Sequence, residues 1–388
     1  MRGFSILLAS ILISPFAFAD KINDALKLYD KKDYKAAASL FKDACEIGDH
    51  LGCFWLGYLY SNGIGVSQDF GMSITMYQKG CDGGYAEACS DLGYMYYSGK
   101  KIPQDYAKAK SLYEKGCEGG NAAACSDLGY MYSYGVGVKQ DFPKAAELLK
   151  QGCDGKNKYA CGELGYLYES GSGVEKNYST ATELYKKACD ADDYLSCNSL
   201  ASLYYKGFGV PKDLKTAANL YTKGCDGNHY NSCSWIGSMY LKGEGVQKNF
   251  ITAADFLKKA CDGKNGYGCA ELGTMHFRGE GVKQDYYKAA SLYQKSCDFG
   301  NKTGCSDIGY MYAHGQGVPL NYKKAKELYQ KACDEGSGVG CYNLGFLYYD
   351  GKGVKQDFKV AKEHFGRACE LGDQPGCDEY ARLNEKGY

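Results

Sequence analysis

Asn121–Lys156 reads NAAACSDLGYMYSYGVGVKQDFPKAAELLKQGCDGK and is one copy of a unit that recurs along nearly the whole chain. The copies follow one another without insertion or deletion, so each column of the repeat is found by adding 36 to a residue number. A strict period of this length predicts a solenoid, in which each unit buries its apolar face against its neighbours. We therefore expect one continuous array of repeats.

The first half of the unit predicts a helix over 122–134. Leu128, Met131 and Tyr132 recur there at the spacing of one helix face. Gly129 lies in the same stripe, and we expect its missing side chain to let the backbone of a neighbouring helix approach closely. The helix should end at Gly135, because glycine readily takes the left-handed conformation that closes a helix.

A second helix should begin at Asp141, whose carboxylate can accept a hydrogen bond from a free amide of the first turn. Pro143 suits that turn, since its missing N–H costs nothing there. Ala145, Leu148 and Leu149 form the apolar face of this helix. Each unit is thus helix, tight loop and helix, which predicts an all-α fold, an α/α solenoid (superhelix) of 36-residue repeats.

These residues resemble a known family. Leu-Gly-x-x-Tyr in the first helix and Lys-Ala-Ala-x-Leu-Tyr in the second are similar to SEL-one-like repeats, which are relatives of tetratricopeptide repeats. The paired cysteines make residues 22–388 resemble the Helicobacter cysteine-rich protein family. This resemblance implies a curved right-handed superhelix with a concave groove. It also implies β-lactam hydrolysis, because members of that family are commonly described as β-lactamases or penicillin-binding proteins.

The order of segments along the chain predicts an exported protein. Residues 1–19 are expected to be a signal peptide, with Arg2, an apolar run over 4–13 and cleavage near Ala19. An N-terminal capping repeat over 20–48, nine repeats over 49–372 and a C-terminal capping helix over 373–388 should follow. No later segment is apolar enough to span a membrane. The destination is the periplasm or the medium.

The 20 cysteines fall in two columns eight residues apart, which predicts one structural disulfide per repeat in an exported chain. Each pair joins the last turn of one helix to the first turns of the next, and closing this short loop contributes roughly 2.5 kcal/mol. A longer link, such as Cys53 to Cys81, and a zinc site are the alternatives, although zinc favours closer pairs. The predicted pairs are Cys45–Cys53, Cys81–Cys89, Cys117–Cys125, Cys153–Cys161, Cys189–Cys197, Cys225–Cys233, Cys261–Cys269, Cys297–Cys305, Cys333–Cys341 and Cys369–Cys377.

The composition excludes several classes of function. Lysine plus arginine and aspartate plus glutamate both number 46, so the basic excess of a nucleic-acid binder is missing. The five histidines occupy different columns, and we predict neither a metal nor a cofactor. Trp55 and Trp235 share one column and are expected to pack in the core. The protein is expected to be a monomer.

The residues argue against a catalytic serine, so whether the chain is an enzyme stays open. Serine β-lactamases carry Ser-x-x-Lys, Ser-Asp-Asn and Lys-Thr-Gly. Ser39 and Ser98 each begin a Ser-x-x-Lys match, and residues 302–304 read Lys-Thr-Gly. Each Ser-Asp pair, however, is followed by leucine or isoleucine. A solenoid would spread these pieces apart, and we assign no catalytic residue.

A partner is expected in the concave groove. By analogy with tetratricopeptide repeats, the groove columns are those of Phe54, Tyr58, Ser61 and Asn62. One column brings four tyrosines in succession and another brings a basic run, which would favour an extended acidic partner. A solvated face without function is the alternative. The predicted groove residues are Tyr58, Tyr94, Tyr130, Tyr166, Lys206, Lys242, Arg278 and His314.

The hypothesis is thus a secreted, disulfide-rich repeat scaffold that binds a protein, an extended peptide or a cell-wall fragment, of host or cell-envelope origin. The alternative hypothesis is the β-lactam hydrolase that the family resemblance implies.

Overall fold

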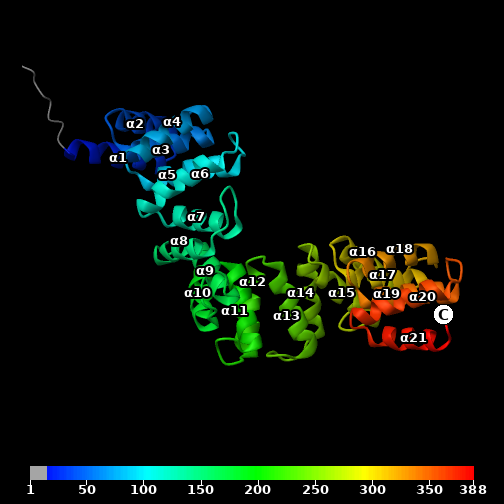
Figure 1. The fold of residues 1–388 in the computed structure, drawn as a ribbon. Coiled ribbons are helices and arrows are strands. Elements are labelled where there is room, and N and C mark those ends of the chain that lie inside the picture. Colours follow the sequence, from blue (N-terminus) through cyan, green and yellow to red (C-terminus); the bar gives the residue numbers. More distant parts are fainter. Residues whose placement is uncertain (1–14) are drawn as a thin grey trace, which may run out of the picture. The chain divides into compact units, whose positions relative to one another are not determined.

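The computed structural model describes residues 15–388, and side chains from residue 21 onward. These residues form 21 helices and no strand (Figure 1). Successive helices pack as antiparallel pairs, so the predicted all-α solenoid of 36-residue repeats is confirmed. Residues 1–14 of the predicted signal peptide lie outside the described part, and α1 runs through the predicted cleavage point at Ala19. No helix of the described residues is both long and apolar enough to cross a membrane.

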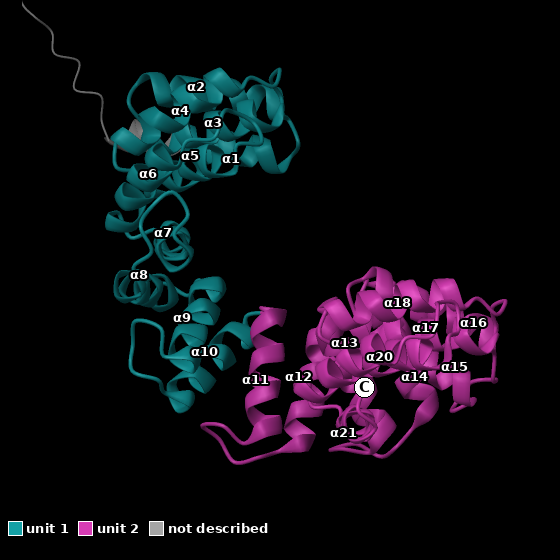
Figure 2. Ribbon diagram, turned by 45° about the vertical axis from the view of Figure 1, so that its right-hand side comes forward, with its two compact units in different colours: residues 1–191 teal, residues 192–388 magenta. Residues whose placement is uncertain are grey.

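The chain divides into two compact units, Met1–Ala191 and Asp192–Tyr388 (Figure 2). The first contains α1 (Pro15–Asp30), α2 (Tyr34–Glu46), α3 (His50–Asn62), α4 (Phe70–Asp82), α5 (Ala86–Ser98), α6 (Tyr106–Glu118), α7 (Ala122–Tyr134), α8 (Phe142–Asp154), α9 (Lys158–Ser170) and α10 (Tyr178–Asp190). The second contains α11 (Tyr194–Lys206), α12 (Leu214–Asp226), α13 (Tyr230–Lys242), α14 (Phe250–Asp262), α15 (Gly266–Arg278), α16 (Tyr286–Asp298), α17 (Lys302–His314), α18 (Tyr322–Asp334), α19 (Gly338–Asp350), α20 (Phe358–Glu370) and α21 (Gln374–Glu385). From α3 onward, odd-numbered helices are the first helices of repeats and even-numbered ones the second.

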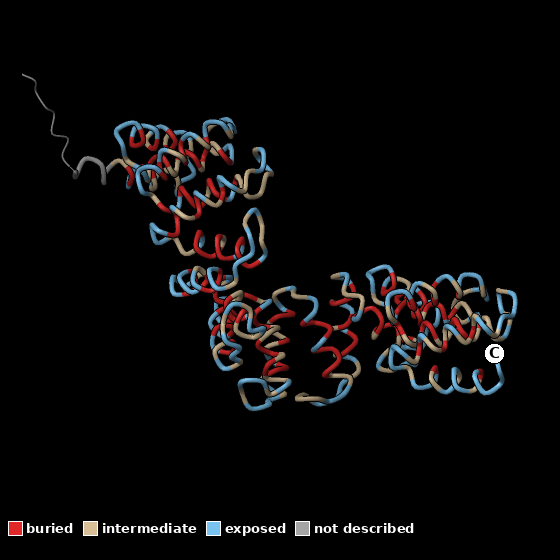
Figure 3. Tube along the Cα trace, viewed as in Figure 1, coloured by how far each residue is buried: buried red, intermediate tan, exposed pale blue. Residues whose placement is uncertain are grey.

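The core of each unit lies where first and second helices meet (Figure 3). In the repeat of α7 and α8, Met131, Ala145 and Leu149 are fully buried. Gly129 permits a close approach of α8: a Cβ there would lie 2.8 Å from Leu149 Cγ and 3.3 Å from the Leu149 amide nitrogen. Both the side chain and the backbone of the neighbouring helix therefore come close to this glycine, as predicted. Most other repeats place a tyrosine ring from the second helix over the same glycine.

The ends of the helices follow the local sequence. Asp141 precedes α8, and its carboxylate accepts a hydrogen bond from the Lys144 amide at 3.0 Å. Gly135 closes α7 with a φ of 69°. Gly137 follows with a φ of 68°, and a Cβ there would lie 2.2 Å from Tyr106 Cβ at the start of α6. Both glycines of this loop are therefore required, one by conformation and the other also by space.

The disulfides confirm the predicted pairing. Nine of the pairs join residues eight apart, with Cα atoms 4.4 to 4.6 Å from each other. Cys189 and Cys197 are also disulfide-bonded. No cysteine among residues 15–388 is free. Such a set of disulfides suits an oxidising environment, either periplasmic or extracellular.

The two tryptophans do not both pack in the core. Trp55 is half-buried, with its ring stacked on Phe41 at a centroid distance of 5.6 Å. Trp235 stacks on Tyr221 at 5.8 Å, yet 43% of its surface is exposed. The prediction is therefore wrong for Trp235, which contacts the rings of Tyr221 and Tyr205 but keeps much of its surface exposed.

Candidate binding site on the first helices

The four predicted groove tyrosines lie on α3, α5, α7 and α9, one in each first helix of the first unit. Tyr94, Tyr130 and Tyr166 are 53%, 39% and 50% exposed. Tyr58 is half-buried, and its ring lies 5.8 Å from that of Trp55. Because α5, α7 and α9 contact one another in succession, their tyrosines stand at the same register on adjacent helices. The first unit thus presents a row of exposed aromatic rings with polar tips.

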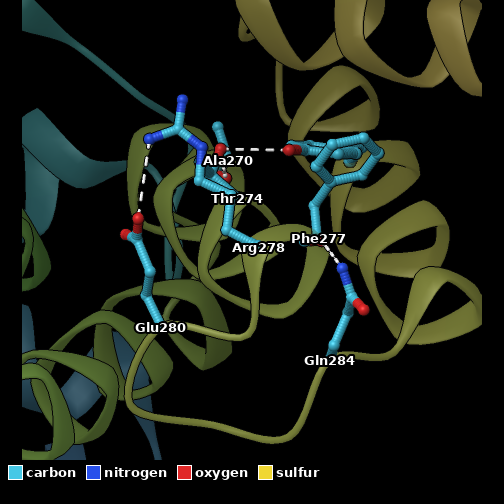
Figure 4. A network of polar contacts seen from close by, with 7 residues as sticks. Ala270, Thr274, Phe277, Arg278, Glu280 and Gln284 are labelled. Carbon is cyan, nitrogen blue, oxygen red and sulfur yellow. Dashed lines mark hydrogen bonds and ion pairs between the residues drawn. The ribbon is translucent and has the colours of Figure 1, made fainter.

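The four predicted basic residues end α11, α13, α15 and α17, and all are exposed. Acidic side chains accompany them. Arg278 pairs with Glu280 at 3.8 Å, as Figure 4 shows. Burial raises the pKa of the half-buried Glu271 carboxyl. The positive charges of Lys242 and Arg278 work against this rise, but their effect is smaller. Acidic side chains from other columns of the repeat therefore lie beside the basic column and partly offset its charge.

His314 completes this column through a local contact. Its Nδ1 lies 2.8 Å from the Tyr310 carbonyl oxygen one turn earlier in α17. The two rings stack with their centroids 4.0 Å apart. The imidazole is thus held against the helix by an aromatic neighbour from the tyrosine column.

Two cavities open at the same columns of the repeat, one in each unit. The first, of about 330 Å³, lies between α3, α4 and α5, and the second, of about 240 Å³, lies between α15, α16 and α17. Each residue of the second cavity is the counterpart, six repeats later, of a residue of the first. The first is lined by Tyr58, Ser61, Asn62, Tyr77, Asp91, Tyr94, Met95, Ser98, Lys100 and Lys101, and the second by Thr274, Phe277, Arg278, Tyr293, Asp307, Tyr310 and Met311.

The walls of the second cavity are tied together by polar contacts (Figure 4). The hydroxyls of Thr274 and Tyr293 lie 3.0 Å apart, which joins α15 to α16. Gln284 donates a hydrogen bond to the carbonyl oxygen of Phe277 at 2.9 Å and so fixes the loop that follows α15. These contacts hold the lining of this cavity in place.

An aspartate belongs to each cavity, and the sequence analysis did not assign these residues a role. Burial raises the pKa of Asp307 to about 7. Burial also raises the pKa of Asp91, while the Tyr77 hydroxyl and the Lys101 ammonium act in the opposite direction. Asp127, in the same column, has its pKa raised by burial to about 6. The sequence feature that could have identified these aspartates is an acidic residue beside the apolar stripe of a first helix.

The serine motifs do not come together as a catalytic site. Ser39 is exposed on α2, and Lys42 pairs with Glu46 at 3.7 Å. Ser98 lines the first cavity, but its hydroxyl lies 3.4 Å from the Met95 carbonyl oxygen. The lysine of this motif, Lys101, instead donates a hydrogen bond to the hydroxyl of Ser61 at 2.9 Å, a contact that the sequence pattern did not predict.

Stacked helix pairs that present one periodic face define a helical-repeat scaffold of the protein-interaction class. The Sel1 repeat family model matches residues 50–85, 86–121, 122–157, 158–193, 195–229, 231–265, 266–301, 303–337 and 338–373. The chain therefore belongs to the Sel1 repeat family.

Two solved structures with TM-scores above 0.5 agree with this assignment. A protective antigen present in uropathogenic Escherichia coli strains is 26% identical, with a TM-score of 0.68, over 90% of this chain and 83% of that one. A Sel1 repeat protein from Oxalobacter formigenes is 25% identical, with a TM-score of 0.61, over 80% and 89%. Cysteine-rich protein B of Helicobacter pylori is 37% identical, with a TM-score of 0.29, over 34% and 93%. No curated protein matches the chain.

Proposed function

We propose that this protein is an exported scaffold that binds an extended segment of a partner protein along the face of its first helices. The observation that carries this proposal is the recurrence of one cavity at the same repeat columns in both units. An extended peptide meets a repeat surface at regular intervals, and it gains most where exposed aromatic rings stand beside small pockets. Tyr94 combines both features, because it is half-exposed and lines the first cavity.

A binding test follows from the row of tyrosines. We select peptides from a random library on the wild-type protein and measure the affinity of the best binder by calorimetry. Tyr94→Ala and Tyr130→Ala should each weaken binding by about tenfold, since truncating a central aromatic residue costs 1–3 kcal/mol. Tyr287→Ala is the matched control, because Tyr287 is 80% exposed on the second helix α16. Equal effects at Tyr287 and Tyr130 would contradict the proposed face.

The alternative, a β-lactam hydrolase, has one observation in its favour. Lys101 Nζ lies 2.9 Å from Ser61 Oγ in the first cavity, and an adjacent amine can activate a serine as a nucleophile. Ser61 itself is only 4% exposed, which opposes attack on a substrate. Nitrocefin turnover that is lost in Ser61→Ala, and kept in Ser39→Ala and Ser98→Ala, would establish this activity. Turnover at background level would dismiss it.

A further inference from the structure

The period of the repeat is broken at the loop that borders the first cavity. In the other repeats, the second glycine of the equivalent loop has a φ between 66° and 72°. At nearly every one of these glycines a Cβ would collide with the start of the preceding second helix. Gly65, for example, would place a Cβ 2.4 Å from the Tyr34 carbonyl carbon. Lys101 occupies this column in the loop after α5, and its φ is not positive. Residues 99–102 therefore follow a different path.

This different path directs the Lys101 side chain back across the preceding repeat. Its ammonium group donates hydrogen bonds to the Ser61 hydroxyl at 2.9 Å and to the Ser61 carbonyl oxygen at 3.4 Å. It also lies 5.7 Å from the centroid of the Phe70 ring. Ser61 is at the end of α3, forty residues earlier in the chain. The lysine thus closes one side of the cavity with a fixed positive charge.

The first cavity consequently has a surplus of cations. Lys100 and Lys101 both line it, against the single carboxyl of Asp91. Neither lysine has a carboxylate oxygen within ion-pair distance among residues 21–388. The hydroxyls of Tyr58, Tyr94 and other lining residues add further hydrogen-bond donors. The counterpart cavity in the second unit has one cation, Arg278, which is already paired with Glu280.

We propose that the first cavity binds the carboxylate of the partner segment, with Lys100 and Lys101 as its counter-ions. This inference rests on the proposed function and specifies the chemistry of one anchor. A volume of about 330 Å³ is large enough for one residue of a peptide. A lysine ammonium on a fixed stem forms short, charge-assisted hydrogen bonds with a carboxylate.

Two kinds of group in a partner segment carry such a carboxylate: the C-terminus of the chain, and the side chain of an aspartate or glutamate. Four probe peptides separate them: acetyl-Gly-Gly-Gly with a free C-terminus, the same peptide amidated, acetyl-Gly-Asp-Gly amide and acetyl-Gly-Asn-Gly amide. The methyl group of Met95, which lines the cavity, reports binding by NMR when the methionines carry ¹³C methyl groups. Met311, in the corresponding position of the other cavity, serves as the internal reference.

The expected result is a shift of the Met95 signal at millimolar peptide with one or both carboxylate probes and with neither neutral analogue. The double variant Lys100→Gln/Lys101→Gln should weaken that binding by about tenfold. Lys139→Gln, in the exposed loop of the next repeat, should leave it unchanged. The single variant Lys101→Gly restores the residue of the other repeats, so it should fold normally and still lose affinity.

Several results would overturn the inference. They are equal shifts with charged and neutral probes, no shift with any probe, and undiminished binding in the double glutamine variant. The proposed function has a separate readout, which is the loss of library-peptide binding in Tyr130→Ala. A peptide that needs Tyr130 but not its own carboxylate would reject the carboxylate anchor and retain the binding face.

Discussion

The half-buried carboxyl of Asp307 makes the stability of the second unit depend on pH. Its pKa of about 7 exceeds the ordinary 3.8, so the folded protein holds this proton more tightly than the unfolded chain. Stability is therefore lost as the pH rises between these two values. We expect Asp307→Asn to raise the free energy of unfolding by about 2 kcal/mol near pH 8 and by almost nothing near pH 3.

Urea unfolding at the two pH values checks this expectation. Asp226→Asn is the control, because Asp226 is exposed at the end of α12. The same stabilisation of Asp307→Asn at both pH values would show that the effect comes from packing and not from the charge.

A single methyl group should test how closely the helices pack. In Gly129→Ala the new Cβ would lie 2.8 Å from Leu149 Cγ and 3.3 Å from the Leu149 amide nitrogen. Overpacking of this kind costs about 1–3 kcal/mol, and thermal unfolding measures it. In Gly71→Ala the nearest atom, the Asp69 carboxylate oxygen, would be 3.3 Å away. That variant should be neutral or slightly more stable, because alanine is the better helix former.

At the scale of the elements, each disulfide joins the end of one repeat to the start of the next. Cys117 is in the last turn of α6 and Cys125 in the first turns of α7, with Cα atoms 4.6 Å apart. Replacing both by alanine should lower the free energy of unfolding by about 2.5 kcal/mol. Hydrogen exchange should rise first where α6 meets α7. Unchanged stability and exchange would show that packing alone holds this junction.

The bounds of the elements could be predicted because each repeat carries its own start and stop signals. Asp141 and Gly135 stand where the sequence analysis placed them, as the cap of α8 and the end of α7. The path of the loop at Lys101 could not be predicted in the same way. Its departure from the repeat was visible in the sequence, but the contact with Ser61 joins residues of different repeats. That contact depends on where the long lysine side chain extends, which the repeat period does not predict.

The candidate site was predicted less completely than the fold. The tyrosine column and the basic column were predicted as groove columns by analogy with tetratricopeptide repeats. The aspartates of the cavities were missed, since a charged residue beside an apolar stripe is usually read as solvated. In the structure the tyrosines of the second helices and the first-helix aspartates meet inside the cavities. Trp235 shows the reverse error, because an aromatic residue in that column remains exposed.

At the scale of the molecule, the two units present faces of different character, aromatic in the first and charged in the second. Contacts to tyrosine rings stabilise a complex by burying apolar surface, which salt changes little. Contacts between charges weaken as the salt concentration rises, because salt screens the electrostatic field. Contacts that a partner makes to the first unit and to the second should therefore respond differently to ionic strength. The surplus of cations at the first cavity is a local exception within the aromatic unit.

Reversing the charges of the basic column tests this difference between the two units. The triple variant Lys206→Glu, Lys242→Glu and Arg278→Glu should weaken binding of a long acidic partner segment and flatten the salt dependence of its affinity, because the field at the second unit changes sign. Stability should change little, since all three residues are exposed. Lys242→Glu carries the largest risk to stability, because it places a second acid near Glu271.

The matched control reverses three exposed lysines of the second helices in the same repeats, namely Lys215, Lys258 and Lys288. Both triple variants have the same net charge, so any difference between them depends on which face carries the charge. Calorimetric titrations at low and high salt distinguish them. Tyr94→Ala and Tyr130→Ala should reduce affinity to the same extent at both salt concentrations. If the two triple variants weaken binding equally, the affinity depends only on the net charge of the protein. The basic column then does not belong to the binding face.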